Sequence, residues 1–182
     1  EDLEDKVIKK PSDGPLQAAL VAVENKSGAV RAMLGGKDYS YSQFNRSVSN
    51  NRMPGSSFKP FVYFTAMKEL GYSPSSVVVD EPLTIPIPGS EPWSPQNFDK
   101  EFAGNIILKK ALMKSINIIS AKLINEVGIE KVIRTARQFG IKSPLGKNPS
   151  LALGTSGLSP YEVASAYSVI ANLGIYNEPY LI

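Results

Sequence analysis

Ser56 and Lys59 are the residues whose types and spacing first suggest chemistry. They begin and end the tetrapeptide Ser56-Ser57-Phe58-Lys59. Residues three apart on a helix share a face, with Cβ atoms about 5–6 Å apart, so a lysine can take the proton of a serine hydroxyl when its amine is kept neutral. A serine that caps a helix, followed by a lysine in solvent, has the same spacing. The motif alone does not separate the two interpretations.

The absence of two residue types narrows the possible chemistry. The chain of 182 residues contains no histidine and no cysteine. This excludes a Ser-His-Asp relay and removes the usual zinc ligands. Any nucleophile must therefore be a hydroxyl, and any base must be a lysine, a carboxylate or a tyrosine. We expect neither a metal nor a cofactor.

A second polar motif, Ser115-Ile116-Asn117, interrupts an apolar helical pattern. Polar residues in such a setting need hydrogen-bond partners or a function. Lysine-assisted acylation of a serine uses a second hydroxyl to pass the proton on and an amide to hold the substrate. A Ser-x-Asn tripeptide at a helix junction supplies both. The other match to this pattern, Ser49-Asn50-Asn51, lies in a polar loop, and we attribute it to loop composition.

The first motif lies where a loop enters a predicted helix. Two apolar runs, 16–24 and 29–34, flank a polar turn and predict a β-hairpin. Further along, Pro54-Gly55 leads into a predicted helix over 56–70. Ser56 is therefore expected at a helix N-terminus, near the positive end of the helix dipole.

The remainder of the chain predicts an extended segment followed by helices. Six of the fourteen prolines lie between Pro74 and Pro95, which excludes a long helix there and favours an ordered arm or a flexible insertion. Apolar residues recur every three or four positions over 108–127, and another helix is predicted over 129–139. Ser159, with proline next and glutamate three residues on, predicts the capped start of a last helix.

Composition and charge are those of an ordinary folded domain. The chain is 42% hydrophobic and 20% charged, with a net charge of +3. No basic stripe interleaved with aromatic residues indicates nucleic-acid binding. The longest apolar runs are far shorter than the roughly 20 residues that a membrane span needs. Residues 1–14 are mostly charged or turn-forming and predict a linker from an upstream domain.

Further segments stand in a fixed order around the two motifs. They are Gly35-Gly36, Phe44-Asn45-Arg46, 52–60, Trp93-x-Pro95-x-Asn97-Phe98-Asp99, 109–117, Leu153-Gly154, 160–167, Ala171-Asn172-Leu173-Gly174 and Pro179. Together they resemble the transpeptidase domain of class A, bifunctional penicillin-binding proteins. So many matched segments in one order are far more specific than either short motif.

The resemblance implies an α/β fold of the serine β-lactamase and D,D-transpeptidase type, in which an antiparallel sheet begun by the hairpin is covered by a helical subdomain holding both motifs. It implies a penicillin-binding serine D,D-transpeptidase that cross-links peptidoglycan stem peptides ending in D-Ala-D-Ala and is acylated by β-lactams. Ser56 would be the nucleophile, Lys59 would take its proton, and Ser115 would relay a proton to the leaving group. Asn117 would bind the substrate backbone and steady Lys59.

The resemblance also implies a setting. Full-length relatives carry an upstream glycosyltransferase domain and a membrane anchor, with the transpeptidase domain outside the cytoplasmic membrane. We therefore expect an extracytoplasmic location, periplasmic or on the outer face of that membrane.

Within the proline-rich segment, we expect Trp93 and Phe98 to pack on the body of the domain, and Asn97 and Asp99 to fix the following turn.

The third motif of the family is missing after Ser115. No Lys-[Ser/Thr]-Gly triplet lies between Ser115 and Ile182, whereas Lys26-Ser27-Gly28 precedes the nucleophile and is assigned to the hairpin turn. We interpret residues 15–182 as the N-terminal part of a transpeptidase domain, completed by downstream residues or by a second chain. The alternatives are a non-catalytic remnant or interaction module of the cell-wall machinery, and a D,D-carboxypeptidase or β-lactamase that transfers the acyl group to water.

Overall fold

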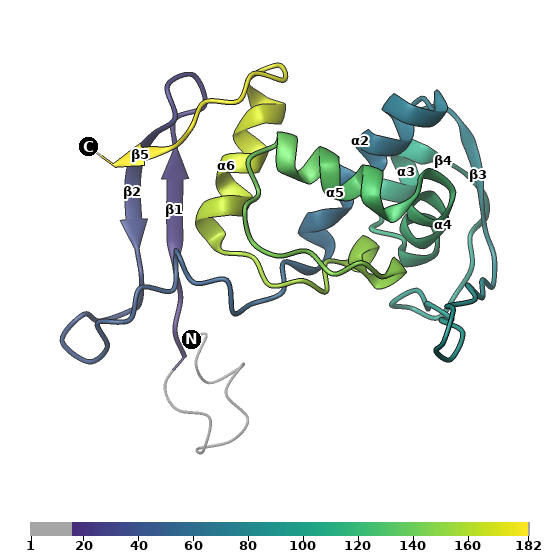
Figure 1. Ribbon diagram of the computed structural model, residues 1–182, viewed down its shortest axis with the longest axis horizontal. Coiled ribbons are helices and arrows are strands. Elements are labelled where there is room, and N and C mark those ends of the chain that lie inside the picture. Colours follow the sequence, from purple (N-terminus) through teal and green to yellow (C-terminus); the bar gives the residue numbers. More distant parts are fainter. Residues whose placement is uncertain (1–15, 182) are drawn as a thin grey trace. The chain divides into compact units, whose positions relative to one another are not determined.

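The computed structural model (Figure 1) describes residues 16–181. The contacts within the chain group them into two compact units. The first unit joins the segment that ends at Asn51 to the segment that begins at Ser159, and the second runs from Arg52 to Leu158. Both candidate motifs lie in the second unit. The linker predicted over 1–14 lies outside the described residues.

A small sheet with strand order β1-β2-β5 belongs to the first unit. β1 (Leu20–Val23) and β2 (Ala29–Leu34) pair antiparallel, which confirms the predicted hairpin. The turn between them needs a left-handed residue, and Gly28 supplies it with a φ of 80°. β5 (Tyr180–Leu181) pairs parallel with β2. The sequence pattern did not indicate this strand because two residues are too few to show an alternation.

Helix α6 (Pro160–Ala171) packs against β1 and begins at the predicted cap. The hydroxyl of Ser159 accepts the backbone N–H of Glu162 at 3.1 Å. The carboxylate of Glu162 in turn accepts the backbone N–H of Ser159 at 3.2 Å. This reciprocal pair satisfies donors that the first turn of a helix otherwise leaves free.

Helix α4 (Asn117–Val127) lies at the centre of the second unit. It contacts α2 (Lys59–Leu70), α5 (Ile129–Gln138) and the 3₁₀ turn η3 (Pro149–Leu153). The apolar repeat predicted for this part of the chain is buried at each of its last four positions: Ile116, Ile119, Leu123 and Val127. The periodicity therefore identified the face of α4 that forms the core.

Aromatic packing holds the beginning of α2. The helix follows the 3₁₀ turn η2 (Gly55–Phe58) and ends at Gly71, whose φ of 72° gives a left-handed cap. The rings of Phe58 and Phe61 meet edge to face with centroids 5.3 Å apart, and Phe61 meets Phe139 in the same way at 5.4 Å. These buried rings fix the turn that precedes Lys59.

The proline-rich segment is ordered around a two-stranded sheet. β3 (Val77–Asp80) pairs antiparallel with β4 (Gly104–Ile107). Between the strands, the backbones of Ile85 and Trp93 exchange two hydrogen bonds of 2.8 Å. Phe98 is fully exposed, so the prediction that it packs on the body of the domain is wrong. Its side chain points away because its neighbour Asn97 takes the buried position.

The helical pattern over 108–127 is broken into two helices. α3 (Leu108–Met113) ends just before the second motif, and α4 begins within it. The sequence predicted one continuous pattern because the apolar residues of α3 and α4 both point to the core of this unit, with Leu108 and Ala111 buried like those of α4. The break places Ser115 between two helix ends.

Candidate active site

The start of α2 presents an exposed serine and a buried lysine. Ser56 lies in η2 and is exposed, whereas Lys59 is the first residue of α2 and only 1% exposed. The backbone N–H of Lys59 donates to the carbonyl of Ser56, so both residues belong to one continuous turn. Burial of Lys59 contradicts the alternative in which this spacing reflects a solvated lysine.

Ser115 occupies a position at which helices usually have glycine. Its N–H donates to the carbonyl of Leu112 at 2.9 Å, and the N–H of Ile116 donates to the carbonyl of Ala111 at 3.0 Å. These two bonds form a Schellman cap at the end of α3, and Ser115 has the left-handed φ of 55° that this cap requires. A residue with a Cβ accepts strain there. In this conformation, the carbonyl and the hydroxyl of Ser115 both accept hydrogen bonds from Lys59 Nζ.

Three acceptors surround the Lys59 ammonium group. Nζ donates to the carbonyl oxygen of Ser115 at 2.5 Å, to Ser115 Oγ at 3.0 Å and to Asn117 Oδ1 at 2.7 Å. An ammonium group has three N–H donors, and this set occupies all of them. Among the described residues, no hydrogen bond joins Nζ to Ser56. Two motifs that lie 56 residues apart thus meet at one nitrogen.

The environment of Lys59 makes its neutral form accessible. Burial lowers the pKa of Lys59 from its ordinary value near 10.5 to about 8, because removal from water penalises the charged amine. At neutral pH, roughly a tenth of the molecules then carry the free amine. A base hydrogen-bonded to the Ser115 hydroxyl, one turn along the backbone from Ser56, is therefore present in a chain without histidine.

A close approach between two backbone segments supports the turn that carries Ser56. Gly154 follows η3 with a φ of 69°, and its carbonyl accepts the N–H of Gly55 at 3.2 Å. A Cβ on Gly154 would lie 2.7 Å from the nitrogen and 2.8 Å from the carbonyl carbon of Gly55, closer than side chains approach a backbone. Sequence reasoning singled out Gly154 only as part of a matched segment. Nothing in the spacing showed that it faces Gly55.

A family model described as the penicillin binding protein transpeptidase domain matches residues 18–182. The chain belongs to this family. The resemblance found in the sequence is therefore confirmed, and the meeting of Lys59 with Ser115 and Asn117 takes place inside a penicillin-binding transpeptidase domain.

Curated relatives of this transpeptidase domain include penicillin-binding protein 1A from several bacteria. The chain is 43% identical over 171 residues to that protein from Neisseria gonorrhoeae, covering 92% of the chain and 21% of the relative. It is 38% identical over 185 residues to the Pseudomonas aeruginosa protein, covering 96% of the chain and 22% of the relative. The chain thus spans about a fifth of the length of the curated relatives it matches.

Solved structures of penicillin-binding proteins share the fold. The crystal structure of penicillin-binding protein 1A from Haemophilus influenzae matches with a TM-score of 0.86 and 37% identity, over 90% of this chain and 24% of that one. PonA1 from Mycobacterium tuberculosis in complex with penicillin V matches with a TM-score of 0.76 and 28% identity, over 90% of this chain and 46% of that one. These matches confirm the predicted α/β fold class.

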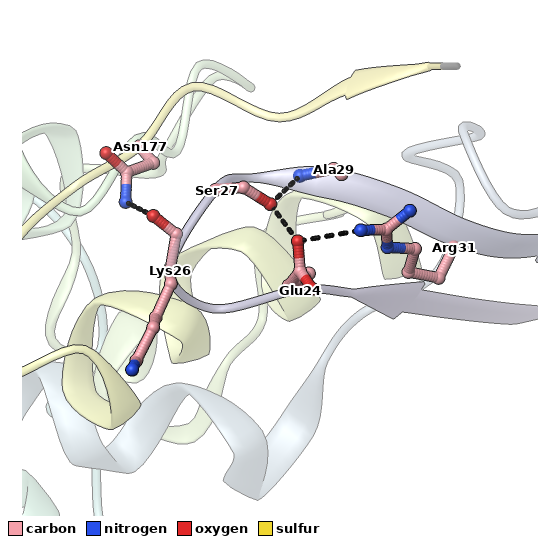
Figure 2. A network of polar contacts seen from close by, with 6 residues as sticks. All are labelled: Glu24, Lys26, Ser27, Ala29, Arg31 and Asn177. Carbon is pink, nitrogen blue, oxygen red and sulfur yellow. Dashed lines mark hydrogen bonds and ion pairs between the residues drawn. The ribbon is translucent and has the colours of Figure 1, made fainter.

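The Lys26-Ser27-Gly28 triplet lies in the turn between β1 and β2, as the sequence predicted (Figure 2). The hydroxyl of Ser27 donates to the Glu24 carboxylate. The carbonyl of Lys26 accepts the side-chain amide of Asn177 at 2.8 Å. These contacts stabilise the turn and its neighbouring segment. The triplet therefore forms part of the hairpin turn, where the sequence placed it.

The described residues offer neither a metal site nor a membrane-spanning helix. Within residues 16–181, histidine, cysteine, aspartate and glutamate side chains form no group of three that could hold a metal ion. No helix over those residues is both long and apolar enough to cross a membrane. The functional groups gathered around Lys59 are an amine, a hydroxyl, an amide and a backbone carbonyl.

Proposed function

We propose that this chain holds the acylation machinery of a penicillin-binding serine D,D-transpeptidase, which cross-links peptidoglycan stem peptides ending in D-Ala-D-Ala through an acyl-Ser56 intermediate. The observation that carries the proposal is the contact of Lys59 Nζ with Ser115 Oγ and Asn117 Oδ1. Membership in the transpeptidase family supports the reaction class. The proposed chemistry uses protein side chains and needs no cofactor.

The first step is attack by the Ser56 hydroxyl on the carbonyl carbon between the two D-alanines. The neutral amine of Lys59 takes the hydroxyl proton as the Oγ–C bond forms. Since Lys59 is buried and its pKa is about 8, the amine is available near neutral pH. The backbone N–H of Ser56 provides one donor for the oxyanion that develops on the carbonyl oxygen.

The second step is departure of the terminal D-alanine. The C–N bond breaks, and the leaving nitrogen takes a proton that passes from Lys59 through the Ser115 hydroxyl, to which Lys59 is hydrogen-bonded at 3.0 Å. Asn117 lies beside the same amine and holds the substrate backbone with its amide. An acceptor amine from a second stem peptide then attacks the acyl-Ser56 ester. The new C–N bond forms the cross-link, the ester C–O bond breaks, and the proton that the amine loses passes by way of Lys59 to Ser56 Oγ.

A β-lactam follows the same first step. Ser56 attacks the lactam carbonyl, the ring C–N bond breaks, and the ring nitrogen takes the proton. Because that nitrogen stays tethered to the acyl group, it does not diffuse away, and the ester persists. The solved complex of PonA1 with penicillin V shows a fold neighbour with such a ligand.

The proposal also covers the location of this domain and the segments that accompany it in a longer protein. We place this domain outside the cytoplasmic membrane, downstream of a glycosyltransferase domain in a membrane-anchored protein. Residues 15–182 supply the first two motifs, and a downstream segment or second chain supplies the Lys-[Ser/Thr]-Gly motif. That motif adds the other oxyanion donor, and the loss of one such donor typically lowers the rate by about 100-fold or more.

Intact-mass spectrometry after incubation with benzylpenicillin tests the proposal. The chain is measured alone and together with the sequence its gene encodes after Ile182, and the adduct is located by peptide mapping. We expect one penicilloyl group on Ser56, absent in Ser56→Ala and retained in the matched neighbour variant Ser57→Ala. Labelling only in the longer protein would support the need for the third motif.

Absence of an adduct in both proteins would overturn the proposed role of Ser56 and favour the interaction module. The rate of deacylation distinguishes the remaining alternative. Release of the acyl group to water within seconds, with no transfer to an added acceptor amine, would indicate a carboxypeptidase or β-lactamase instead of a transpeptidase.

A further inference from the structure

The N-terminus of α4 lacks a cap from its own chain neighbours. Ile116 stands at the capping position, and its side chain accepts no hydrogen bond. The first N–H groups of a helix need acceptors when they are shielded from water. Here, the amide oxygen of Asn97 accepts the N–H of Asn117 at 3.1 Å and the N–H of Ile118 at 3.2 Å. A residue from the proline-rich segment thus caps the helix that begins in the second motif.

Asn97 is held in one orientation by its other side-chain contacts. It is 7% exposed, and its Nδ2 donates to both carboxylate oxygens of Asp80 at 3.0 Å and to the carbonyl of Glu101 at 2.9 Å. Asp80 is itself 2% exposed and also accepts the N–H of Ala103 at 2.8 Å. Because the Asp80 carboxylate and the Glu101 carbonyl accept the Nδ2 hydrogens, the amide oxygen of Asn97 must face α4.

The same segment also orients the side chain of Asn117. The backbone carbonyl of Gln96 accepts Asn117 Nδ2 at 2.8 Å. With its nitrogen turned to Gln96, the amide of Asn117 points Oδ1 at Lys59, 2.7 Å away. The two adjacent residues Gln96 and Asn97 thus hold the side chain and the backbone of Asn117, respectively.

We infer that Asn97, locked by Asp80, is a positioning residue of the active site, which sets the orientation of Asn117 and thereby the acceptors around Lys59. This inference rests on the proposed function for its kinetic consequence, although the contacts themselves do not. Asn97 touches no reacting group and acts through α4. The sequence predicted only that Asn97 fixes a local turn.

Removal of the Asn97 cap from α4 should lower the pKa of Lys59. In Asn97→Ala, the N-terminus of α4 loses its acceptor and Asn117 loses its fixed backbone. The ammonium form of Lys59 then loses an acceptor, so its pKa should fall further below about 8. Since misplacement by about 1 Å can cost on the order of 100-fold in rate, we expect acylation of Ser56 to slow by about 10- to 100-fold.

Exchanging the two side chains provides a rescue variant. Asn97→Asp alone places two buried carboxylates against each other, which is unfavourable. Asn97→Asp combined with Asp80→Asn keeps an oxygen facing α4 and a hydrogen bond between the two positions. We expect the double variant to acylate faster than Asn97→Asp. The control is Ser159→Ala, which removes the cap of α6 in the other unit and should lower thermal stability with no change at Lys59.

The experiment uses the protein as its gene encodes it and measures two quantities. The first is the benzylpenicillin acylation rate as a function of pH, and the second is the titration of the Lys59 Cε signal in ¹³C-lysine-labelled protein. The titration needs no acylation, so failure of wild-type protein to be labelled would refute the proposed function and leave the inference testable. A slower rate and a lower Lys59 pKa in Asn97→Ala, with neither change in Ser159→Ala, would support the inference.

Wild-type acylation and an unchanged Lys59 titration in folded Asn97→Ala would overturn it. If Asn97→Ala does not fold, the comparison of Asn97→Asp with the double variant Asn97→Asp/Asp80→Asn tests the inference. A double variant that folds and still acylates as slowly as Asn97→Asp would also refute the positioning role.

Discussion

Replacing Gly154 by alanine should displace the turn that carries Ser56. The backbone of Gly154 lies against Gly55, the residue before the nucleophile, and the two are joined by a 3.2 Å hydrogen bond. A new Cβ would meet the nitrogen of Gly55 at 2.7 Å and its carbonyl carbon at 2.8 Å. Non-bonded carbon contacts are ordinarily about 3.5–4.0 Å, so the two segments must separate by roughly 1 Å.

The size of the effect follows from two separate costs. Alanine at the φ of 69° seen in Gly154 is strained by roughly 1–2 kcal/mol. The displacement of Gly55 moves the neighbouring Ser56 relative to Lys59, and a misplacement of about 1 Å can lower the rate of a positioned reaction by about 100-fold. We therefore expect Gly154→Ala to lose both stability and acylation.

Gly71→Ala is the matched control. Gly71 has a φ of 72°, and a Cβ there would meet nothing within 4 Å. It carries the same backbone strain without the clash, so it should lose similar stability and keep the wild-type acylation rate. Thermal unfolding and the rate of Ser56 labelling by a fluorescent penicillin measure the two effects. Equal acylation rates in the two variants would refute the argument that contact with Gly154 positions Ser56.

Two further outcomes concern Lys59 and Ser115. The free energy of unfolding should rise with pH between about 8 and 10.5, by at most about 1.4 kcal/mol per pH unit, because only the unfolded chain still binds the Lys59 proton there. Urea denaturation across this range should show the rise in wild-type protein and lose it in Lys59→Met. Ser115 has a φ of 55°, so Ser115→Gly should be more stable than Ser115→Ala by roughly 1 kcal/mol, while both acylate slowly without the hydroxyl. Equal thermal stability of the two Ser115 variants would contradict the claim of backbone strain.

Local signals predicted much of the secondary structure. The hairpin followed from two apolar runs around Gly28, and the start of α6 followed from the capping residues at Ser159 and Glu162. Pro54-Gly55 predicted the entry into a helical segment at Ser56, but residues 55–58 form the 3₁₀ turn η2, and α2 begins only at Lys59. The hairpin and α6 predictions succeeded because each depends on the φ preferences and hydrogen bonds of residues a few positions apart.

Other features depend on partners far along the chain. The break between α3 and α4 could not be predicted from periodicity, because the apolar faces of both helices point to one core. The exposure of Phe98 was missed because the neighbouring Asn97 uses the interior position to bind Asp80. Parallel pairing of β5 with β2 likewise joins residues from the two ends of the described chain.

By itself, the sequence determined which residue types can act as nucleophile and base in this protein. Without histidine or cysteine, it left a serine and a lysine at helical spacing as the economical nucleophile and base, and its matched segments identified the transpeptidase family. Only the tertiary structure decided that Lys59 is buried and shared between Ser115 and Asn117. It alone also showed that Gly154 lies against Gly55 and that Asn97 accepts the backbone N–H of Asn117. The physical reason is that desolvation and hydrogen-bond geometry depend on which distant segments pack together, which residue spacing does not encode.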